Sequence, residues 1–230
     1  MRFLKLRNKV FAYIFSIVVS LSAISAVFAK TSEETGNTGY IAIIIDDFGY
    51  DGEGTEEMLK LEIPFTAAIM PFSERTAEDC ELVVQSGNEA IIHMPMESKD
   101  GKKSWVGKKG IFCDTTSEEI KKIVNDAFDA VGIAVGLNNH MGSAIMEDQE
   151  KVEAAMDIVA QRGGIFVDSL TTGKSKGKLV AEEKGVDYLE RTAFIDSPGN
   201  TDAVVKNILK AAEVAKSKGY AIAIGHVGPA

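Results

Sequence analysis

Two acidic residues and three histidines are the residues of this sequence best suited to bind a metal ion and move protons. The acids are adjacent, at Asp46 and Asp47. The 230-residue chain contains only three histidines, His93, His140 and His226. Imidazoles and a carboxylate are the usual ligands of catalytic zinc, which keeps an open position for water. A second carboxylate can then act as general base and a histidine as general acid, so these residue types indicate metal-assisted hydrolysis of an amide or ester.

Short, strongly apolar strands must position these side chains. Residues 41–45, Ile-Ala-Ile-Ile-Ile, are too short for a helix and rich in β-branched side chains, which is typical of a strand buried on both faces. Asp46 and Asp47 follow directly, and on an extended backbone we expect them to point to opposite sides. Gly49 then allows a tight turn. The alternative is a solvated strand-to-loop transition without a site.

Strands and helices alternate along residues 40–230. The expected strands are Ile41–Ile45, Phe65–Ile69, Ala90–His93, Ala134–Leu137, Ile165–Val167, Val186–Leu189 and Tyr220–Ile224. The expected helices are Thr55–Leu61, Thr76–Ser86, one from the capping box at Thr116 to Gly132, Asp148–Gln161, Lys178–Lys184 and Asn200–Ser217. This α/β pattern predicts a parallel sheet closed into a seven-stranded β/α barrel. An open doubly wound sheet also fits, but the Gly-rich phosphate loop is missing after the first strand.

The last helix and the end of the chain carry two further expectations. Apolar spacing predicts that one face of this helix is buried, with Val204, Val205, Ile208, Leu209 and Ala212. The sequence stops at residue 230, soon after the seventh strand, so we expect that the C-terminal covering segment of the barrel is missing. Residues 94–114 form a long irregular stretch that contains the only tryptophan, Trp105, and loops of this length are usually functional or disordered.

Polar residues gather after the expected strands, whose carboxyl ends meet on one face of a barrel. They are Asp46 and Asp47 after the first strand, His93 and Glu97 after the third, Asn138, Asn139, His140 and Ser143 after the fourth, Asp168 after the fifth and His226 after the seventh. Three histidines at strand ends predict a common site. The alternative is a histidine-bearing rim without a metal. Several methionines lie nearby, and we expect them to fill the barrel rather than bind copper.

Five motifs carry a resemblance to a known family. They are I-A-I-I-I-D-D-F-G, H-M-P-M-E, G-L-N-N-H-M-G-S, F-V-D-S-L-T-T and A-I-A-I-G-H. From about residue 40 onward the chain resembles the divergent polysaccharide deacetylase family, the YibQ-like branch of the NodB-type carbohydrate esterases. The resemblance implies an irregular seven-stranded β/α barrel and metal-dependent removal of acetyl groups from sugars. The implied substrate is an envelope or exopolysaccharide glycan.

The resemblance also implies roles for individual residues. Asp46 matches the catalytic base and Asp47 its metal-binding partner. His93 matches the first metal histidine, at the end of the stretch Gly87–His93, and His226 matches the late histidine that acts as acid. The arginine–proline–tyrosine-type motif of ordinary deacetylases is missing. Three alternatives for the function therefore stay open. The protein has an altered substrate, it has lost its activity, or it is a non-catalytic envelope protein that binds a glycan or a partner.

The second metal histidine of the family is replaced by Glu97. Either Glu97 or His140 then completes the metal site, and we favour His140 because imidazole suits zinc better than another carboxylate. The asparagines beside it, Asn138 and Asn139, are expected to hold its ring in place. The expected substrate-binding or supporting residues are Glu97, Asn138, Asn139, Ser143 and Asp168, the last of which can also orient a histidine.

Residues 1–29 have the pattern of a signal peptide, with four basic residues before an apolar run from Val10 to Phe28. We expect export to the periplasm, cell envelope or exterior, a linker at residues 30–39 and a single domain at residues 40–230. An uncleaved membrane anchor is the alternative. Removal of residues 1–29 changes the formal net charge from −9 to −13, because four positive charges and no negative ones are lost. Such an acidic protein is not expected to bind nucleic acid or anionic lipid.

Cys80 and Cys113 are the only cysteines. An oxidising compartment would permit one disulfide between them, and two separate thiols are equally compatible with the sequence.

Overall fold

The computed structural model describes residues 38–50, 53–196 and 200–228, and residues 39–230 form one compact unit. The expected signal peptide and almost all of the expected linker lie outside the described residues. Among the residues that are described, no helix is both long enough and apolar enough to cross a lipid bilayer.

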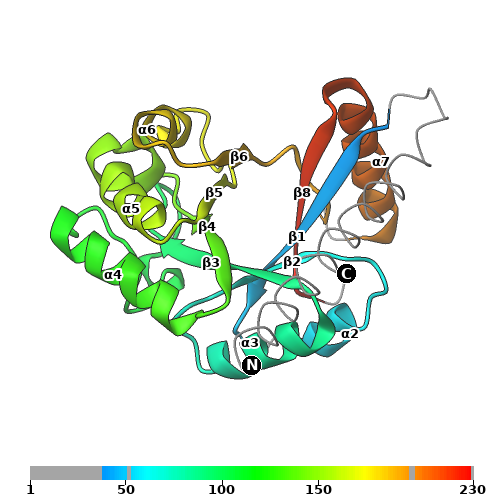
Figure 1. The fold of residues 1–230 in the computed structure, drawn as a ribbon, viewed down its shortest axis with the longest axis horizontal. Coiled ribbons are helices and arrows are strands. Elements are labelled where there is room, and N and C mark those ends of the chain that lie inside the picture. The colour runs from blue at the N-terminus through cyan, green and yellow to red at the C-terminus, as the bar shows by residue number, and fades with distance from the viewer. Residues whose placement is uncertain (1–37, 51–52, 197–199, 229–230) are drawn as a thin grey trace, which may run out of the picture. The chain divides into compact units, whose positions relative to one another are not determined.

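Eight strands form a single sheet in the order β6-β5-β4-β3-β2-β1-β8-β7 (Figure 1). The strands are β1 (Tyr40–Phe48), β2 (Thr66–Ile69), β3 (Glu89–Met96), β4 (Ala134–Met141), β5 (Ile165–Asp168), β6 (Tyr188–Glu190), β7 (Ala193–Phe194) and β8 (Tyr220–His226). Every pairing between neighbouring strands is parallel, as the buried apolar runs predict. The α/β class is therefore confirmed.

The sheet has eight strands rather than the seven expected, because two short strands, β6 and β7, occupy residues 188–194. They are the two edges of the sheet, yet only Arg191 and Thr192 separate them in the chain. The Arg191 N–H donates to the Asp168 carbonyl of β5 at 2.9 Å, and the Thr192 N–H donates to the Ile222 carbonyl of β8 at 2.7 Å. The sheet therefore curves until its two edges are joined through this connection. The expected covering segment concerns chain beyond residue 230 and stays a prediction.

One side of the curved sheet is packed by apolar residues from several strands. They are Ile44, Ala68, Ile91, Val167, Ile222 and Ile224. Side chains alternate between the two faces of a strand, so the second residue after each of these lies on the same face. Asp46 follows Ile44 in this way in β1. His93 follows Ile91 and His226 follows Ile224, so the alternation that packs the interior also brings the polar residues to its carboxyl end.

Helices cover the other face of the sheet. They are α2 (Thr55–Leu59), α3 (Thr76–Ser86), α4 (Ser117–Ala130), α5 (Gln149–Gln161), α6 (Gly177–Lys184) and α7 (Thr201–Lys218), with short 3-10 helices η1 (Lys103–Trp105) and η2 (Ile145–Glu147) in the loops. The expected capping box begins α4, where the side chains of Thr116 and Glu119 each accept the other residue's N–H. Buried residues of α4 and α5 pack with Ile45, Ile69 and Ile92 of the sheet.

The prediction for the buried face of α7 was right for Ile208, which packs against the core, and wrong for Val205 and Leu209. Ala211 and Ala215 are its buried residues, whereas Val205 is 53% and Leu209 62% exposed. The helix lies so close to Gly39 that a side-chain carbon there would come within 2.2 Å of the Ala215 backbone. Because of this close approach, small residues occupy the fully buried positions of α7, and Ile208 and Val214 pack beside them while partly exposed.

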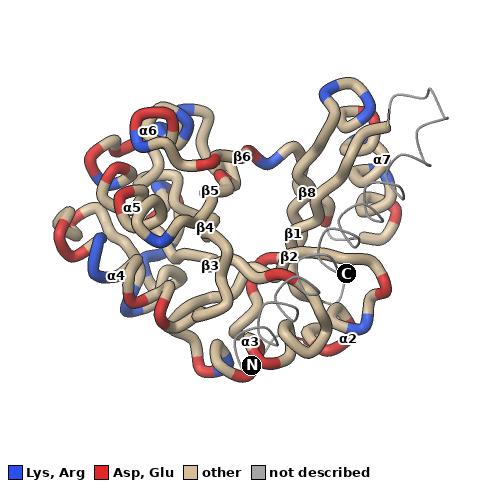
Figure 2. Tube along the Cα trace, viewed as in Figure 1, with Lys and Arg blue, Asp and Glu red and all other residues tan. Residues whose placement is uncertain are grey.

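Acidic and basic residues occur together on most of the helices (Figure 2). The chain has 34 acidic and 25 basic residues, so the excess of negative charge is distributed among positive charges on the surface. Cys80 in α3 is partly buried and Cys113 is exposed, and both are free thiols.

Candidate metal centre and active site

Asp46 and Asp47 lie near the end of β1, where its pairing with β2 is irregular. The register shifts between Ile45 and Phe48, and Asp47 adopts a φ of 71°, in the left-handed region that non-glycine residues rarely occupy. Asp46 Oδ1 lies 3.6 Å from Nδ1 of His93, and Asp47 Oδ1 lies 3.3 Å from Nε2 of the same ring. The expectation that the two acids point to opposite sides was wrong, because the strand is not regular at Asp47 and both carboxylates reach one histidine.

The turn after this irregularity is held by α3. Gly49 has a φ of 96°, and a side-chain carbon there would lie 2.9 Å from the Met70 carbonyl oxygen. The Gly49 N–H donates to Oδ2 of the fully buried Asp79 at 2.7 Å, and Arg75 pairs with the other oxygen of Asp79 at 3.3 Å. These contacts support the backbone that carries Asp47. Sequence reasoning missed Asp79, because an acid in the first turn of a helix has the pattern of a surface residue.

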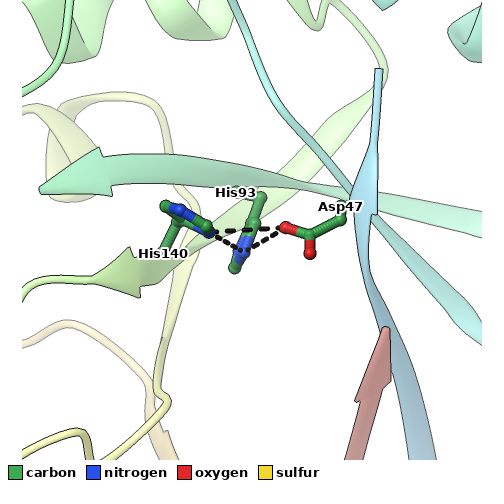
Figure 3. Close-up of side chains that lie close together, drawn as sticks. All are labelled: Asp47, His93 and His140. Carbon is green, nitrogen blue, oxygen red and sulfur yellow. Dashed lines mark hydrogen bonds and ion pairs between the residues drawn. The ribbon is translucent and has the colours of Figure 1, made fainter. Parts of the chain in front are cut away.

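Asp47, His93 and His140 come from three strands and point toward one another (Figure 3). Asp47 Oδ1 lies 3.3 Å from His93 Nε2 and 3.3 Å from His140 Nδ1. The two ring nitrogens are 3.0 Å apart. Within the described part of the chain, the buried Asp47 Oδ1 accepts no hydrogen bond. Three potential ligand atoms therefore converge, and one of them has unused acceptor capacity.

The spacing of these atoms fits a small divalent metal ion. Ligand bonds of about 2.0–2.1 Å separate two donors by about 3.3–3.4 Å in tetrahedral coordination and by about 2.8–3.0 Å in octahedral coordination. The observed separations of 3.0 and 3.3 Å lie between these values. Two imidazoles and one carboxylate suit zinc and other first-row divalent metals. The three residues could hold such an ion and leave coordination positions open.

Asn138 links His93 to Asp46. Its Oδ1 lies 2.7 Å from His93 Nδ1, and its Nδ2 donates to Asp46 Oδ1 at 2.8 Å. When Nδ1–H donates to the amide oxygen, Nε2 of His93 keeps its lone pair for a metal. The expectation that the asparagines hold His140 was therefore wrong. Asn138 holds His93 instead, and Asn139 donates to the Met141 carbonyl and accepts the Ser169 N–H.

The electrostatic environment of the three residues favours a bound cation. Burial by itself raises the pKa of Asp47, but the two imidazoles outweigh it and hold this pKa well below its usual value. Burial lowers the pKa of His93, but the charges of Asp46 and Asp47 outweigh it and raise this pKa to about 9. Without a metal, a proton on His93 therefore balances the carboxylates. Burial also raises the pKa of Asp46, which suits a group that accepts a proton.

His226 lies at the end of β8, directly opposite Asp46 in the pairing of β1 with β8. Both its backbone N–H and its Nδ1 are 2.8 Å from Oδ2 of Asp196, and its ring stacks on Phe194. The hydrogen bond to Asp196 raises the pKa of His226, so the ring stays protonated to higher pH, as a general acid requires. The side chain is 38% exposed, and Nε2 is the nitrogen that Asp196 leaves available.

Sequence reasoning also missed Asp196, although a signal was present. Residues 193–196, Ala-Phe-Ile-Asp, are an apolar triplet followed by an acid, which is the same pattern as the other strand ends.

The structure brings His140, and not Glu97, to Asp47 and His93. The Glu97 carboxylate accepts the Cys113 N–H at 2.8 Å and pairs with Lys103 at 3.3 Å. These contacts anchor the long loop that follows β3.

Ser143 and Asp168 also have structural partners. Ser143 Oγ accepts the Lys99 N–H at 2.9 Å and so anchors the same loop. The fully buried Asp168 accepts hydrogen bonds from the Ser175 and Tyr188 hydroxyls and from the Leu170 N–H. Among its contacts in the described ranges there is no histidine, so nothing in the geometry links it to the ligand cluster.

Known proteins share this sequence and fold. The chain is 32% identical over 192 residues to the uncharacterized protein YibQ of Escherichia coli K12, which covers 84% of this chain and 60% of YibQ. It is 32% identical over 189 residues to an uncharacterized protein of Haemophilus influenzae Rd, covering 82% of this chain and 67% of that protein. The chain thus spans about three-fifths to two-thirds of the length of these relatives.

A solved structure and a protein family also match. The structure of the uncharacterized protein ATU2773 from Agrobacterium tumefaciens C58 has the same fold, with a TM-score of 0.78, 15% identity, and coverage of 86% of this chain and 80% of that one. Residues 43–230 match the family described as divergent polysaccharide deacetylase. Because this match includes most of the chain, the protein belongs to the divergent polysaccharide deacetylase family.

Proposed function

We propose that this protein is an exported, metal-dependent hydrolase that removes acetyl groups from an envelope or exopolysaccharide glycan. The convergence of Asp47, His93 and His140 at ligand spacing is the observation that carries the proposal. Membership of the family supports a carbohydrate substrate. The export part of the proposal rests on the pattern of residues 1–29, and zinc is the metal that the donor set suits well.

A divalent metal held by Asp47, His93 and His140 would polarise the acetyl carbonyl and lower the pKa of a bound water. Asp46 is the residue that takes up the proton of the attacking water. Asn138 fixes Oδ1 of Asp46, and burial raises the pKa of this carboxyl, so Asp46 is a stronger base than an exposed carboxylate.

His226 supplies a proton to the departing amine or hydroxyl of the sugar. Asp196 holds Nδ1 of His226 and stabilises the imidazolium, which leaves Nε2 as the donor. One proton of the water thus moves to Asp46 and one proton leaves His226 for the sugar, so the products are acetic acid, which ionises to acetate in solution, and the deacetylated sugar. Transfer of the proton from Asp46 to His226 restores the starting state.

Release of acetate from N-acetylated and O-acetylated oligosaccharides tests this proposal. We expect the metal-loaded protein to release acetate, Asp46→Asn to retain the metal but lose turnover, and Asp47→Ala to lose both. Asp129→Asn, an exposed acid on α4, is the matched control and should behave as the native protein. Full activity in Asp46→Asn would contradict the assigned base. Glycan binding with neither metal nor turnover would favour the non-catalytic alternative.

A further inference from the structure

A groove of about 600 Å³ lies beside the ligand cluster and has no part in the proposed chemistry. Its walls include Gly49, Tyr50, Phe72, Pro95, Lys108 and Lys109. We call it the basic groove. Its position, charge and aromatic residues together indicate what it binds.

The basic groove is continuous with the strands that carry the metal ligands. Gly49 lies two residues after Asp47, and Pro95 lies two residues after His93. The turn after β1 and the end of β3 therefore form part of the groove wall, each two residues beyond a ligand. A glycan that presents an acetyl group to the cluster must place a neighbouring sugar unit near this wall.

The two lysines give the groove unpaired positive charge. Lys108 and Lys109 are both exposed, and neither has a carboxylate partner among the described residues. Arg75, which also lines the groove, is paired with Glu78 at 3.2 Å and Asp79 at 3.3 Å and so adds little. Glu74 is the one acid among the described residues of the wall, so the two lysines still leave the groove with an excess of positive charge, in contrast with the formal net charge of −9 for the chain.

The loop that carries these lysines is anchored to the sheet. The Ile111 N–H donates to the Pro95 carbonyl at 2.9 Å, and the Glu97 N–H donates to the Ile111 carbonyl at 2.8 Å. Val106 and Ile111, on either side of the lysines, are buried. The backbone at Lys108 and Lys109 is therefore held between two fixed points.

Aromatic side chains complete the groove. The Lys109 ammonium lies 5.0 Å from the centre of the Phe72 ring, and Tyr50 lines the same space. Small-molecule sites typically combine apolar and aromatic walls with a few polar groups that fix orientation. Aromatic surface suits the apolar faces of a sugar, and the ammonium groups suit an anion.

We propose that the basic groove binds a negatively charged group, a carboxylate or a phosphate, on the sugar unit beside the one that carries the acetyl group. The substrate is then an acidic glycan rather than a neutral one. This inference rests on the proposed function for the place of the acetyl group. The groove gives the reaction its preference among glycans, because Lys108 and Lys109 attract the anionic chain.

Binding of three oligosaccharides of equal length tests the proposal. One alternates N-acetylglucosamine with glucuronate, one is a neutral N-acetylglucosamine oligomer, and one carries phosphate groups on the same neutral chain. Calorimetry with the native protein should show about 5- to 20-fold tighter binding of an acidic oligosaccharide than of the neutral one, as two exposed ion pairs allow. The preference should shrink as salt is added. Preference for glucuronate or for phosphate identifies the anion.

Variants separate the groove from general charge effects. Lys108→Gln/Lys109→Gln should lose the preference and its salt dependence, and Lys108→Arg/Lys109→Arg should keep both. The matched control is Lys206→Gln/Lys210→Gln, which removes two exposed lysines from α7 and should also keep both. Thermal unfolding checks that each variant is folded. Equal binding of neutral and acidic chains by the native protein, or an unchanged preference in Lys108→Gln/Lys109→Gln, would overturn the proposal.

Acetate release in the same samples separates this inference from the proposed function. Turnover without any preference for acidic chains would remove the role of the groove and leave the hydrolase assignment intact. Preferential binding that depends on Lys108 and Lys109, without acetate release from any of the three oligosaccharides, would support the groove and contradict the hydrolase.

Discussion

Replacement of Asn138 by leucine should weaken metal binding although Asn138 is not itself a ligand. The amide is fully buried and bonds to both His93 Nδ1 and Asp46 Oδ1. Leucine has a similar size and branching but neither a donor nor an acceptor. Asn138→Leu therefore leaves two buried polar groups without their partner and frees the ring of His93 to rotate.

The magnitude follows from these two lost hydrogen bonds. A buried group that loses its partner costs about 1–3 kcal/mol, so the free energy of unfolding should fall by about 2–6 kcal/mol. Residues that orient a metal-binding histidine typically contribute about 10- to 100-fold to metal affinity. Asp46 Oδ1 and His93 Nδ1 are 3.6 Å apart and can form a direct contact without Asn138. The free energy of unfolding should therefore fall by an amount in the lower half of the range of about 2–6 kcal/mol.

Metal titration against a competing chelator and urea denaturation measure the two effects. Asn139→Leu is the matched control, because Asn139 is also buried but bonds to the Met141 carbonyl and the Ser169 N–H rather than to a ligand ring. We expect both variants to lose stability and only Asn138→Leu to lose most of its metal affinity. Native metal affinity in folded Asn138→Leu would refute the reasoning.

Three further predictions follow from the geometry. Asp196→Asn should lower the pKa of His226, because the hydrogen bond from His226 to the Asp196 carboxylate is weakened. The general acid then loses its proton at a lower pH, so the alkaline limb of the pH–rate profile should shift to lower pH. An unchanged alkaline limb would contradict this role. Gly49→Ala should lower the free energy of unfolding by about 1–3 kcal/mol, since the φ of 96° at Gly49 and the contact with the Met70 carbonyl exclude a side chain. Urea denaturation measures this loss, and native stability of the variant would show that the turn relaxes. Metal at about 100 times its dissociation constant should stabilise the protein by about 2.7 kcal/mol, seen as a higher Tm that a chelator reverses; an equal Tm with and without metal would oppose binding at a folded site.

The strands and helices follow largely from local sequence patterns. The β-branched isoleucines favour an extended backbone in β1, and the capping box begins α4 through contacts between Thr116 and Glu119. The strand β7 has only a short apolar triplet, residues 193–195, as its local signal, and its two residues are a strand through their pairing with β8. The buried face of α7 depends on its close approach to Gly39, a contact between distant parts of the chain.

The site was predictable at the level of residues and not of their orientation. His93 and His140 were expected to lie near Asp47, because parallel strands align their carboxyl ends, and the structure places them together. The direction of Asp47 depends on an irregular pairing with β2 that the sequence does not reveal. Asn138 and Asp196 were assigned other partners or none, because their hydrogen bonds cross between strands.

The metal content of the purified protein tests the central claim most directly. Elemental analysis after metal supplementation and desalting would be compared between the native protein, Asp47→Ala and the control Asp129→Asn. The account predicts about one divalent metal ion per chain in the native protein and the control, and none in Asp47→Ala. A native protein without metal, or one whose metal survives the loss of Asp47, would contradict a centre formed by Asp47, His93 and His140.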